Sequence, residues 1–435
     1  MKVLVHARGV VGRAMGSTGV RCYHTARVLA EALPEAQITL AIPNEPDMPA
    51  PHPRVRVIHQ RDPWMGLIQM LSHDIIISRN FSPSLIPLFF HKRLALDFYT
   101  AFFVEWMALS ANRFQIPRRR AAWAASNRHY IDFQLTLADF VFCANERQRD
   151  AWVGAMSALG LITPQMYDRD SRLRGLIDVV PYGVQPGRPK HTRQVLKGVV
   201  PNIRETDTVL LWNGSIMEWF DALTVIRAIG EVSRVRDDVK LYFLGTEHPD
   251  LVTGLLFRPP QEAVELSKQL GLYERSVFFN VGWVPYNEIG NFLAEADIGV
   301  CASFDNLEAR YSFRTRYVDL FWAELPIICT EGDVLAERVR QDPLGIAVAP
   351  GDVRGYAEAI LRLVKDRDFY QRCRSNMPAI KEELSWERVL TPLVEFCRST
   401  QSMAAPKRQR MPPLVRRAAR YVLTHSWQQV VTRQR

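Results

Sequence analysis

Short apolar runs recur along the whole chain, and segments with a helical spacing of apolar positions separate them. Most of the runs are continuous and rich in β-branched or aromatic residues, which is typical of strands buried on both faces of a parallel sheet. Regular alternation of such strands with helices predicts an α/β fold class. Two sets of it predict two doubly wound, Rossmann-like domains that face a central cleft. The runs are 2–7, 37–42, 55–59, 74–78, 93–98, 139–144 and 177–180 in the first half, and 208–213, 239–244, 276–281, 297–302, 326–330 and 345–349 in the second.

A stretch rich in proline and glycine, residues 181–191, lies between the two sets of runs and predicts an interdomain hinge. A chain of 435 residues is too long for one ordinary core and suits two domains. We therefore expect an N-terminal domain over residues 1–185 and a C-terminal domain over residues 186–385.

The composition is that of a globular protein, with 47% hydrophobic residues. No apolar run reaches the roughly 18 residues that a membrane span requires. The first residues, MKVLVHARG, read as a strand and lack the apolar core of a signal peptide, so we expect a cytoplasmic protein. The six cysteines lie far apart without metal-ligand spacing, so we expect reduced, mostly buried thiols and no metal site.

The net charge of +9 comes from the C-terminal end of the chain. Residues 404–435 contain eight basic residues and no acid, and the remainder holds 47 bases against 46 acids. This distribution argues against a body that binds nucleic acid. A helix in this basic tail would place Val415, Ala419, Val422, Leu423 and Val430 on one side, and Arg416, Arg417 and Arg420 mainly on the other.

Together with Tyr421 and Trp427, such a helix would suit an anionic membrane surface. Two alternatives stay open: the helix packs on the protein body, or the tail is disordered. A nucleic-acid arm is less favoured than any of these.

Loops that follow strands are the expected place for chemistry, because doubly wound sheets bind ligands outside the carboxyl ends of their strands. These loops would face the cleft between the domains, which makes that cleft the default site. Four of them carry glycine, polar or charged residues: 7–21, 213–221, 245–250 and 303–316.

The first of these loops has glycines at positions 12, 16 and 19 before an amphipathic helix. Glycines permit close backbone approach and a helix N-terminus favours an anion, so the loop could cradle a phosphate. The spacing is not that of a dinucleotide fingerprint, which argues against a nicotinamide cofactor. A loop without a ligand is an equally favoured alternative.

The segment 307–327, LEARYSFRTRYVDLFWAELPI, places arginines at the start of an apolar helix. We expect Ser312 or Thr315 to cap a helix that runs to Trp322. Its first turn would present backbone N–H groups beside Arg314 and Arg316, a suitable setting for a diphosphate.

The two arginines would point in directions about 200° apart if both were helical, so only one could face a ligand. Either could instead form an ion pair with Glu308 or Asp319. Asp319 lies in an otherwise apolar helix, where a buried acid needs partners, and sugar hydroxyls would serve.

Several motifs resemble those of GT-B glycosyltransferases, in particular glycosyltransferase family 4 of the bacterial group 1 type. The run RYVDLFWAELPI (316–327) is similar to the helix, turn and proline of that family's donor site. The other similar stretches are GSTGVR (16–21), NERQRDAW (145–152), VVPYGV (179–184), LWNGS with WFDAL (211–223), GTEHP (245–249) and GWVPY (282–286).

The resemblance implies the GT-B fold and a retaining, metal-independent transferase of hexosyl type. Such an enzyme passes a sugar from a nucleotide sugar to a hydroxyl of a glycan or lipid-linked acceptor, in cell-surface polysaccharide assembly. The nucleotide sugar is then a substrate, and no cofactor is implied. The donor would lie on the second domain and the acceptor on the first. Residues 386–403 would form a helix that returns to the first domain, and a membrane-bound tail would suit a lipid-linked acceptor on the inner face of the cell membrane.

Carried over position by position, the resemblance assigns residues to donor and catalytic roles. Asp97 follows a strand of the first domain and is expected to contact the acceptor or the transferred sugar, with Glu105 behind it, although an acid there is also often a helix cap. Glu308 is expected to be the acid near the sugar. The donor-binding residues are expected to be Gly16, Gly19, Gly214, Ser215, Gly245, His248, Arg314, Thr315, Arg316 and Asp319.

The sequence departs from the family pattern at several points. The glutamate that holds the ribose is replaced by Asp319, one methylene shorter, and the other glutamate of the motif falls on Tyr311. The family's basic pair would fall near Ser215 and Trp219, neither of which is basic. We expect Arg314 or Arg316 to supply that charge.

Two further interpretations remain open. A noncatalytic GT-B subunit that binds a partner or glycan would explain the missing basic pair, and a nucleotide-sugar epimerase is a third reading. The Asp-x-Asp pairs at 168/170 and 366/368 are interpreted as solvated surface. Glu324 stands where the family has glycine at a helix C-terminus, a position that often requires left-handed backbone.

Overall fold

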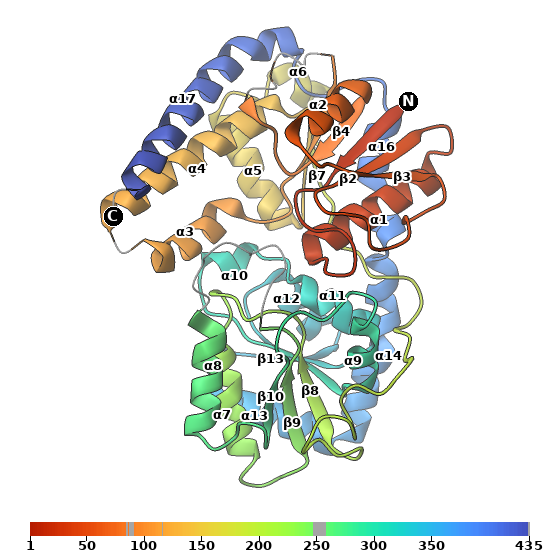
Figure 1. Ribbon diagram of the computed structural model, residues 1–435, viewed down its shortest axis with the longest axis vertical. Coiled ribbons are helices and arrows are strands. Elements are labelled where there is room, and N and C mark those ends of the chain that lie inside the picture. Colours follow the sequence, from red (N-terminus) through yellow and green to blue (C-terminus); the bar gives the residue numbers. More distant parts are fainter. Residues whose placement is uncertain (84–85, 87–90, 115, 247–257, 434–435) are drawn as a thin grey trace. The chain divides into compact units, whose positions relative to one another are not determined.

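The computed structural model describes residues 1–83, 86, 91–114, 116–246 and 258–433, which divide into two compact units. The first unit comprises Met1–Gly12, Ser17–Pro181 and Val389–Arg435, and the second comprises Arg13–Gly16 and Tyr182–Arg388. Each unit contains one parallel sheet with helices against it (Figure 1). The α/β fold class and the two Rossmann-like domains expected from the sequence are confirmed.

The sheet of the first unit has seven parallel strands in the order β3-β2-β1-β4-β5-β6-β7. All of them lie within the apolar runs that predicted them. The strands are β1 (Lys2–His6), β2 (Gln37–Ile42), β3 (Val55–His59), β4 (Ile75–Ser78), β5 (Arg93–Asp97), β6 (Phe140–Cys143) and β7 (Ile177–Val179). The helices are α1 (Ser17–Ala32), α2 (Pro63–Ser72), α3 (Phe102–Arg113), α4 (Pro117–Leu137), α5 (Glu146–Ala158), α6 (Pro164–Arg169), α16 (Thr391–Arg398) and α17 (Lys407–Arg433).

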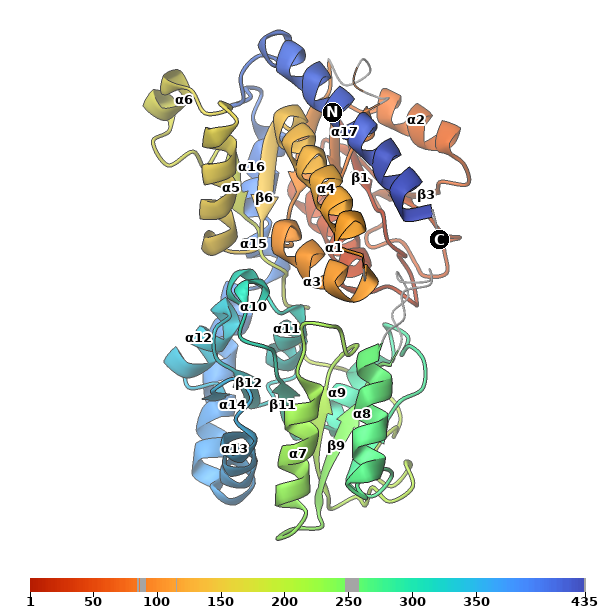
Figure 2. The same cartoon turned by 90° about the vertical axis from the view of Figure 1, so that its left-hand side faces the viewer.

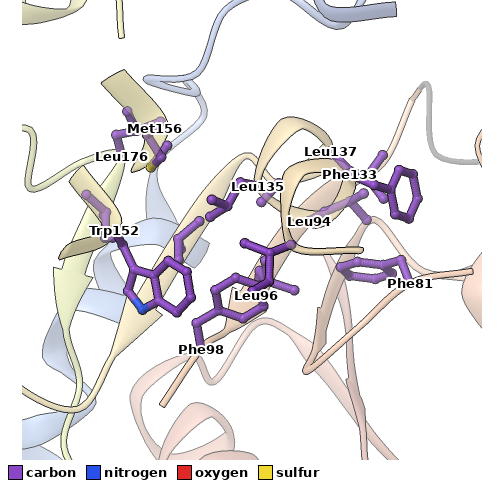
Figure 3. Close-up of a cluster of buried hydrophobic side chains, with 14 of the residues drawn as sticks. Phe81, Leu94, Leu96, Phe98, Phe133, Leu135, Leu137, Trp152, Met156 and Leu176 are labelled. Atoms are coloured by element: carbon purple, nitrogen blue, oxygen red, sulfur yellow. The ribbon is translucent and has the colours of Figure 1, made fainter. Parts of the chain in front are cut away.

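A layer of large apolar side chains fills the space between this sheet and its helices. Leu94 and Leu96 on β5 meet Phe133 and Leu135 on α4, and Trp152 on α5 packs against the same cluster (Figure 3). All five side chains are almost completely buried. Burial of a large apolar side chain stabilises a fold by roughly 1.5–3 kcal/mol, so this cluster is a main source of the unit's stability.

The sheet of the second unit has six parallel strands in the order β10-β9-β8-β11-β12-β13. The strands are β8 (Thr208–Trp212), β9 (Val239–Phe243), β10 (Val277–Phe279), β11 (Ile298–Cys301), β12 (Ile327–Thr330) and β13 (Gly345–Val348). The helices are α7 (Ala222–Val232), α8 (Arg258–Gln269), α9 (Ile289–Glu295), α10 (Leu307–Tyr311), α11 (Thr315–Trp322), α12 (Val334–Gln341), α13 (Val353–Lys365) and α14 (Arg367–Glu383), and the short α15 (Trp386–Val389) follows.

The strand order reverses once in each sheet. In the first unit β1 pairs with both β2 and β4, and in the second β8 pairs with both β9 and β11. A doubly wound sheet opens a crevice at such a switch point, outside the carboxyl ends of the strands. The loops after β1 and β8 are therefore the places where each unit can bind a ligand.

The backbone at Glu324 adopts the left-handed conformation that the sequence predicted, with φ of 57°. A residue other than glycine is strained there. The carboxylate of Glu324 accepts a hydrogen bond from Lys381 at 2.9 Å and forms an ion pair with Arg188 at 2.7 Å. These ion pairs offset part of the strain and give a reason for an acid at this position.

The basic tail forms the long helix α17, which lies alongside α4 in both views (Figures 1 and 2). The guanidinium of Arg410 is buried and donates to the carbonyl oxygens of Thr136, Leu137 and Ala138 at the end of α4. It also forms an ion pair with Asp139. Of the two alternatives to a free membrane helix, packing on the protein body is thus the one that the structure shows.

The side of α17 that faces the body differs from the expected one. Leu414 and Ala418 are buried, and Arg417 donates to Thr136 and to the carbonyl of Leu159. The sequence placed the three arginines mainly opposite the apolar residues, and this holds only for Arg417. Arg416 and Arg420 are instead exposed on the same face as those apolar residues. Exposed residues on the outer face of α17 are Val415, Arg416, Ala419, Arg420, Val422, Leu423 and Trp427.

The buried ion pair between Arg410 and Asp139 gives a test of how firmly α17 is attached. Replacing Arg410 by alanine leaves Asp139 with Lys407 as its remaining cation and leaves the carbonyls of α4 without their donor. We expect Arg410→Ala to destabilise the first unit by about 3 kcal/mol, the cost of breaking a buried pair.

Hydrogen exchange of residues 131–143 at increasing urea concentration measures this loss. The matched control is Arg416→Ala on the exposed face of the same helix, which should change stability by less than about 0.5 kcal/mol. Equal exchange rates in both variants would show that the Arg410 contacts contribute nothing.

Candidate functional site

Two glycine-containing loops meet at the carboxyl edge of the second sheet, on the β9 side of the switch point. Gly214 follows β8 with φ of 86°, a left-handed conformation that favours glycine. Gly245 follows β9, and a side chain there would meet the carbonyl carbon of Gly214 at 3.6 Å and the nitrogen of Ser215 at 3.7 Å. The loops after β8 and β9 therefore pack backbone against backbone at the carboxyl edge of the sheet, as expected for a ligand-binding edge.

Arg314 forms a two-pronged ion pair with Glu308. Its Nη1 and Nη2 donate to the two carboxylate oxygens at 2.9 and 2.7 Å, and both side chains are buried. The hydroxyl of Ser312 also donates to Glu308, at 2.5 Å. Both oxygens of Glu308 are thus engaged, and the ion-pair alternative weighed for the arginines holds for Arg314.

Arg316 is buried without a neutralising acid. Its Nη2 donates to the carbonyl oxygen of Ser215 at 2.8 Å, and its Nη1 has no hydrogen-bond partner. Within the part of the chain that the structure describes, no carboxylate lies within ion-pair distance of it. The guanidinium lies over two aromatic rings, 3.7 Å from the ring centre of Phe220 and 5.1 Å from that of Trp212.

Burial lowers the pKa of Arg316 below its ordinary value, and the nearby Arg314 adds to this effect. A buried cation without an anion is costly, and two aromatic faces recover only part of that cost. The arrangement is explained if an anionic ligand completes it, since charge-assisted hydrogen bonds to guanidinium N–H groups are strong.

The start of α11 differs from the prediction. The helix begins at Thr315, the preceding residue Arg314 occupies the cap position, and no side chain caps the helix. Ser312 instead bonds to Glu308, so neither predicted capping residue has that role. Because Arg314 has an extended ψ of 91°, the helical-spacing argument that the two arginines point apart fails. Their guanidiniums lie near the same ring, that of Phe220.

Asp319 lies one turn into α11 and reaches the end of β8. Its Oδ2 accepts a hydrogen bond from Nδ2 of Asn213 at 2.8 Å. Burial raises the pKa of Asp319 to about 6, although the bond from Asn213 and the charge of Arg316 oppose the shift. Further hydrogen-bond donors would stabilise the ionised form of a buried carboxylate, and ribose hydroxyls are such donors.

In the first unit, Asp97 at the end of β5 forms a buried ion pair with Arg21 on α1 at 2.7 Å. Arg21 also donates to the carbonyl oxygens of Val180 and Pro181. The second oxygen of Asp97, Oδ1, is buried and makes no hydrogen bond to the described residues. Asp97 therefore holds the end of β5 to α1 and retains one unused acceptor atom.

The glycine loop after β1 leads directly into α1. Gly16 precedes the first residue of that helix and Gly19 lies in its first turn, and both are buried. At Gly12 φ is 148°, and a side chain there would collide with Oδ1 of Asp47 at 1.8 Å. Close packing against Asp47 is thus a sufficient reason for glycine at position 12. The predicted donor residue His248 lies outside the described residues.

The aromatic rings around Arg316 were not singled out from the sequence. Trp212 ends β8 and Phe220 lies in the loop that follows; both belong to the family-like stretch 211–223, but no role was expected for either ring. Glu218 in the same loop was missed as well. Burial raises its pKa, and its Oε2 makes no hydrogen bond to the described residues. Nothing in their spacing indicates that they surround an arginine about a hundred residues further along the chain.

Three sequence expectations about the rest of the chain can be compared with the structure. No cysteine forms a disulfide, and all except Cys22 are buried, as predicted. Among the described residues, no group of His, Cys, Asp or Glu side chains is arranged to hold a metal ion. Within the same residues, no helix combines the length and the apolarity needed to cross a bilayer.

The GT-B fold is the class that this architecture defines, and solved structures agree over almost the whole chain. Sucrose-phosphate synthase from Thermosynechococcus elongatus is 15% identical with a TM-score of 0.59, over 92% of this chain and 98% of that one. WaaG, a glycosyltransferase involved in lipopolysaccharide biosynthesis, is 14% identical with a TM-score of 0.59, over 92% and 100%. Anabaena HepE, solved with UDP and glucose, is 15% identical with a TM-score of 0.59, over 91% and 99%.

A family match is found within the second unit. Residues 207–366 match the family described as glycosyl transferases group 1. No curated protein sequence matches the chain significantly. The resemblance indicated by the motifs is thus confirmed, and the match includes Arg316 and Asp319.

The raised pKa of Asp319 predicts a pH-dependent cost in stability. Above pH 6 the carboxylate is charged in a site that disfavours the charge, whereas below about pH 4 it is neutral in the folded protein. The contribution of Asp319 to stability therefore falls as the pH rises from about 4 to 6. We expect Asp319→Asn to raise the melting temperature by about 2–4 °C at pH 8, the shift produced by roughly 1 kcal/mol.

Thermal melts at pH 8 and pH 4 test this expectation, with little change predicted at pH 4. Asp305→Asn is the control, because Asp305 is an exposed acid in the same unit. An Asp319→Asn shift of the same size at both pH values would contradict a titration of Asp319 near pH 6.

Proposed function

We propose that this protein is a retaining, metal-independent glycosyltransferase that moves a hexose from a nucleotide sugar to a hydroxyl of a glycan or lipid-linked acceptor. The observation that carries the proposal is the buried, unneutralised guanidinium of Arg316 at the switch point of a group 1 glycosyltransferase domain. The donor diphosphate is the anion that would complete this site.

The chemistry needs a cation at this place. As the bond between sugar and diphosphate breaks, negative charge grows on the diphosphate and the sugar becomes oxocarbenium-like. A fixed cation in a site of low dielectric stabilises that charge strongly, since it needs no reorganisation during the reaction. Arg316 is fixed by the Ser215 carbonyl and by the Phe220 ring, and supplies from α11 the charge that is missing from the loop after β8.

The neighbouring residues have distinct roles in this proposal. Asp319 accepts hydrogen bonds from the ribose, and Asn213 orients its carboxylate. Gly214, Ser215 and Gly245 let the diphosphate approach the backbone where the two loops meet. Thr315 offers the first backbone N–H of α11 to the same group.

The two carboxylates that the sequence marked as catalytic have different roles in this proposal. Glu308 is close to the donor end of α11, but both its oxygens hold Arg314, so we propose that it acts by fixing the polar start of the helix. Asp97 remains our candidate for contact with the acceptor, because its Oδ1 makes no hydrogen bond to the described residues. Gly16 and Gly19 would bring the α1 backbone close to the substrates.

UDP-glucose is the first donor to test, because Anabaena HepE has been solved with it. Retention of configuration is read from the anomeric form of the product. A noncatalytic GT-B subunit is the alternative that the missing basic pair favours. Release of UDP, with or without transfer to an acceptor, supports the enzyme, whereas binding of donor without any turnover supports the alternative.

The role of Arg316 can be tested by binding alone. We expect Arg316→Gln to weaken UDP binding by about 10- to 100-fold, or roughly 1.4–3 kcal/mol, because a charge-assisted contact to the diphosphate is lost. Uridine, which lacks phosphate, should bind both proteins equally. Isothermal titration calorimetry measures both ligands.

Arg340→Gln is the matched control, since Arg340 is an exposed arginine of the same unit. Its UDP affinity should equal that of the unaltered protein, and thermal melts establish that each variant is folded. If Arg316→Gln binds UDP as tightly as the control, Arg316 does not hold the diphosphate and the proposed function loses its main support.

We also propose that the outer face of α17 binds the anionic cytoplasmic surface of a membrane, where a lipid-linked acceptor would be found. Arg416 and Arg420 are exposed there beside Leu423 and Trp427, which are 70% and 45% exposed. Basic residues next to exposed aromatic and aliphatic side chains suit the interface of an anionic bilayer.

Flotation with lipid vesicles tests the membrane proposal. The protein should bind vesicles of phosphatidylglycerol and not vesicles of phosphatidylcholine. At about 1 kcal/mol for each basic residue, the double variant Arg416→Gln, Arg420→Gln should bind roughly thirtyfold more weakly. The control is Arg54→Gln, Arg56→Gln, two exposed arginines elsewhere in the first unit. Equal loss in both double variants would mean that α17 has no special role.

A further inference from the structure

Two arginines without acidic partners lie at the switch point of the first unit. Strands β1 and β4 are neighbours, and their pairing sets His6 beside Ser78. The side chains of this pair are joined by a hydrogen bond of 3.0 Å. Arg8 follows His6 by two positions and Arg79 follows Ser78 by one, so both arginines emerge at the carboxyl edge of the sheet.

The guanidinium of Arg79 is held in place by neutral groups. It lies 5.2 Å from the ring centre of Phe102 and 5.7 Å from that of Tyr99, and its Nη2 donates to the hydroxyl of Thr100 at 3.3 Å. No carboxylate of the described residues lies within ion-pair distance. Arg79 is thus fixed by two rings and one hydroxyl, while the charge of its guanidinium is not neutralised.

Arg8 lies in the same electrostatic environment. Its side chain is exposed and forms no ion pair with the described residues. Its charge acts on His6 and, together with that of Arg79, on the hydroxyl of Tyr130, whose pKa burial raises to about 12 in spite of both cations. Both arginines thus act electrostatically on the same hydroxyl, that of Tyr130.

Two acids lie near this charge, and one of them is already engaged by another arginine. Asp97 is already paired with Arg21 at 2.7 Å. Glu105 on α3 acts electrostatically on Tyr99, as Arg79 and Arg21 do. Three cations and two acids gather around the carboxyl ends of β1, β4 and β5, and one of those acids is neutralised within the fold.

A row of aromatic rings continues from this charged edge, buried at Phe102 and partly exposed at Trp106, Tyr130 and Tyr421. Phe102, below Arg79, stacks on Trp106 at 5.2 Å between ring centres, and Trp106 meets Tyr130 at 5.7 Å. Tyr130 in turn meets Tyr421 of α17 at 5.5 Å. A ligand bound at the arginines would have an aromatic wall beside it, which suits a sugar ring or a hydrocarbon chain next to an anionic group.

We propose that Arg8 and Arg79 bind a phosphate or diphosphate group of the acceptor, so that the acceptor substrate of this protein is phosphorylated. Guanidinium groups recognise phosphate oxygens with paired hydrogen bonds, and both of these lie at the carboxyl edge of the same sheet. This inference rests on the proposed function, because it describes the second substrate of the same reaction.

The phosphate could belong to a soluble sugar phosphate or to a lipid-linked diphosphate sugar, and the experiment separates the two. The protein is first saturated with UDP, which occupies the donor site on the second unit. Glucose 6-phosphate, geranyl diphosphate and uncharged octyl glucoside are then titrated by calorimetry. We expect a phosphorylated probe to bind, octyl glucoside to bind at least tenfold more weakly, and the tighter of the two phosphorylated probes to identify the source.

Arg8→Gln and Arg79→Gln should each weaken binding of the phosphorylated probe by about tenfold or more, with UDP affinity unchanged. Arg54→Gln, an exposed arginine of the same unit, should bind the probe normally. Because Arg8 is exposed, its variant keeps the test valid even if Arg79→Gln fails to fold.

Two results would overturn the inference: no binding of either phosphorylated probe beyond that of octyl glucoside, or binding that both arginine variants leave intact. In either case, retained UDP binding that depends on Arg316 would leave the proposed function standing. Loss of UDP binding altogether would instead count against the proposed function itself.

Discussion

A single buried positive charge organises the candidate donor site. The guanidinium of Arg316 is buried away from water. Its contacts in the fold are a hydrogen bond to one carbonyl oxygen and the faces of two aromatic rings. Such an arrangement stays folded only because the surrounding contacts are extensive, and it gains most when an anion arrives. Three nearby features support this arrangement. The left-handed turn at Gly214 and the backbone contact at Gly245 shape the loop beside the guanidinium. The ion pair of Arg314 with Glu308 engages that acid, so the charge of Arg316 is left for a ligand.

The fold could be predicted from the sequence because most buried strands are continuous apolar runs and helical segments follow many of them. The order of strands in the two sheets could not, since pairing depends on contacts between distant segments. The site was predicted at the level of its segment. The choice between Arg314 and Arg316 was beyond sequence reasoning, because both lie within eight residues of Glu308. An extended ψ at Arg314 decides which of them forms the ion pair.

In the C-terminal tail, too, the contacts with distant residues could not be predicted from the sequence. Its composition predicts a basic, amphipathic helix, and the structure contains that helix. Which face turns inward depends on Asp139, a residue far away in the sequence that attracts Arg410 and Lys407. Two cations are thereby drawn to the body, whereas Arg408, Arg416 and Arg420 remain exposed. Arginine therefore has two roles in this helix: Arg410 attaches it to the body, and Arg416 and Arg420, two to three turns further on, give its exposed face a positive charge.

The hydrogen bond between Asn213 and Asp319 has a thermodynamic consequence for ligand binding. Near pH 6 a good part of the Asp319 population carries a proton, and a ligand that donates hydrogen bonds to the carboxylate favours the ionised form. Binding of a nucleotide would then release protons to the solution. The heat measured for that binding would contain the ionisation heat of the buffer, and it would differ between two buffers of the same pH.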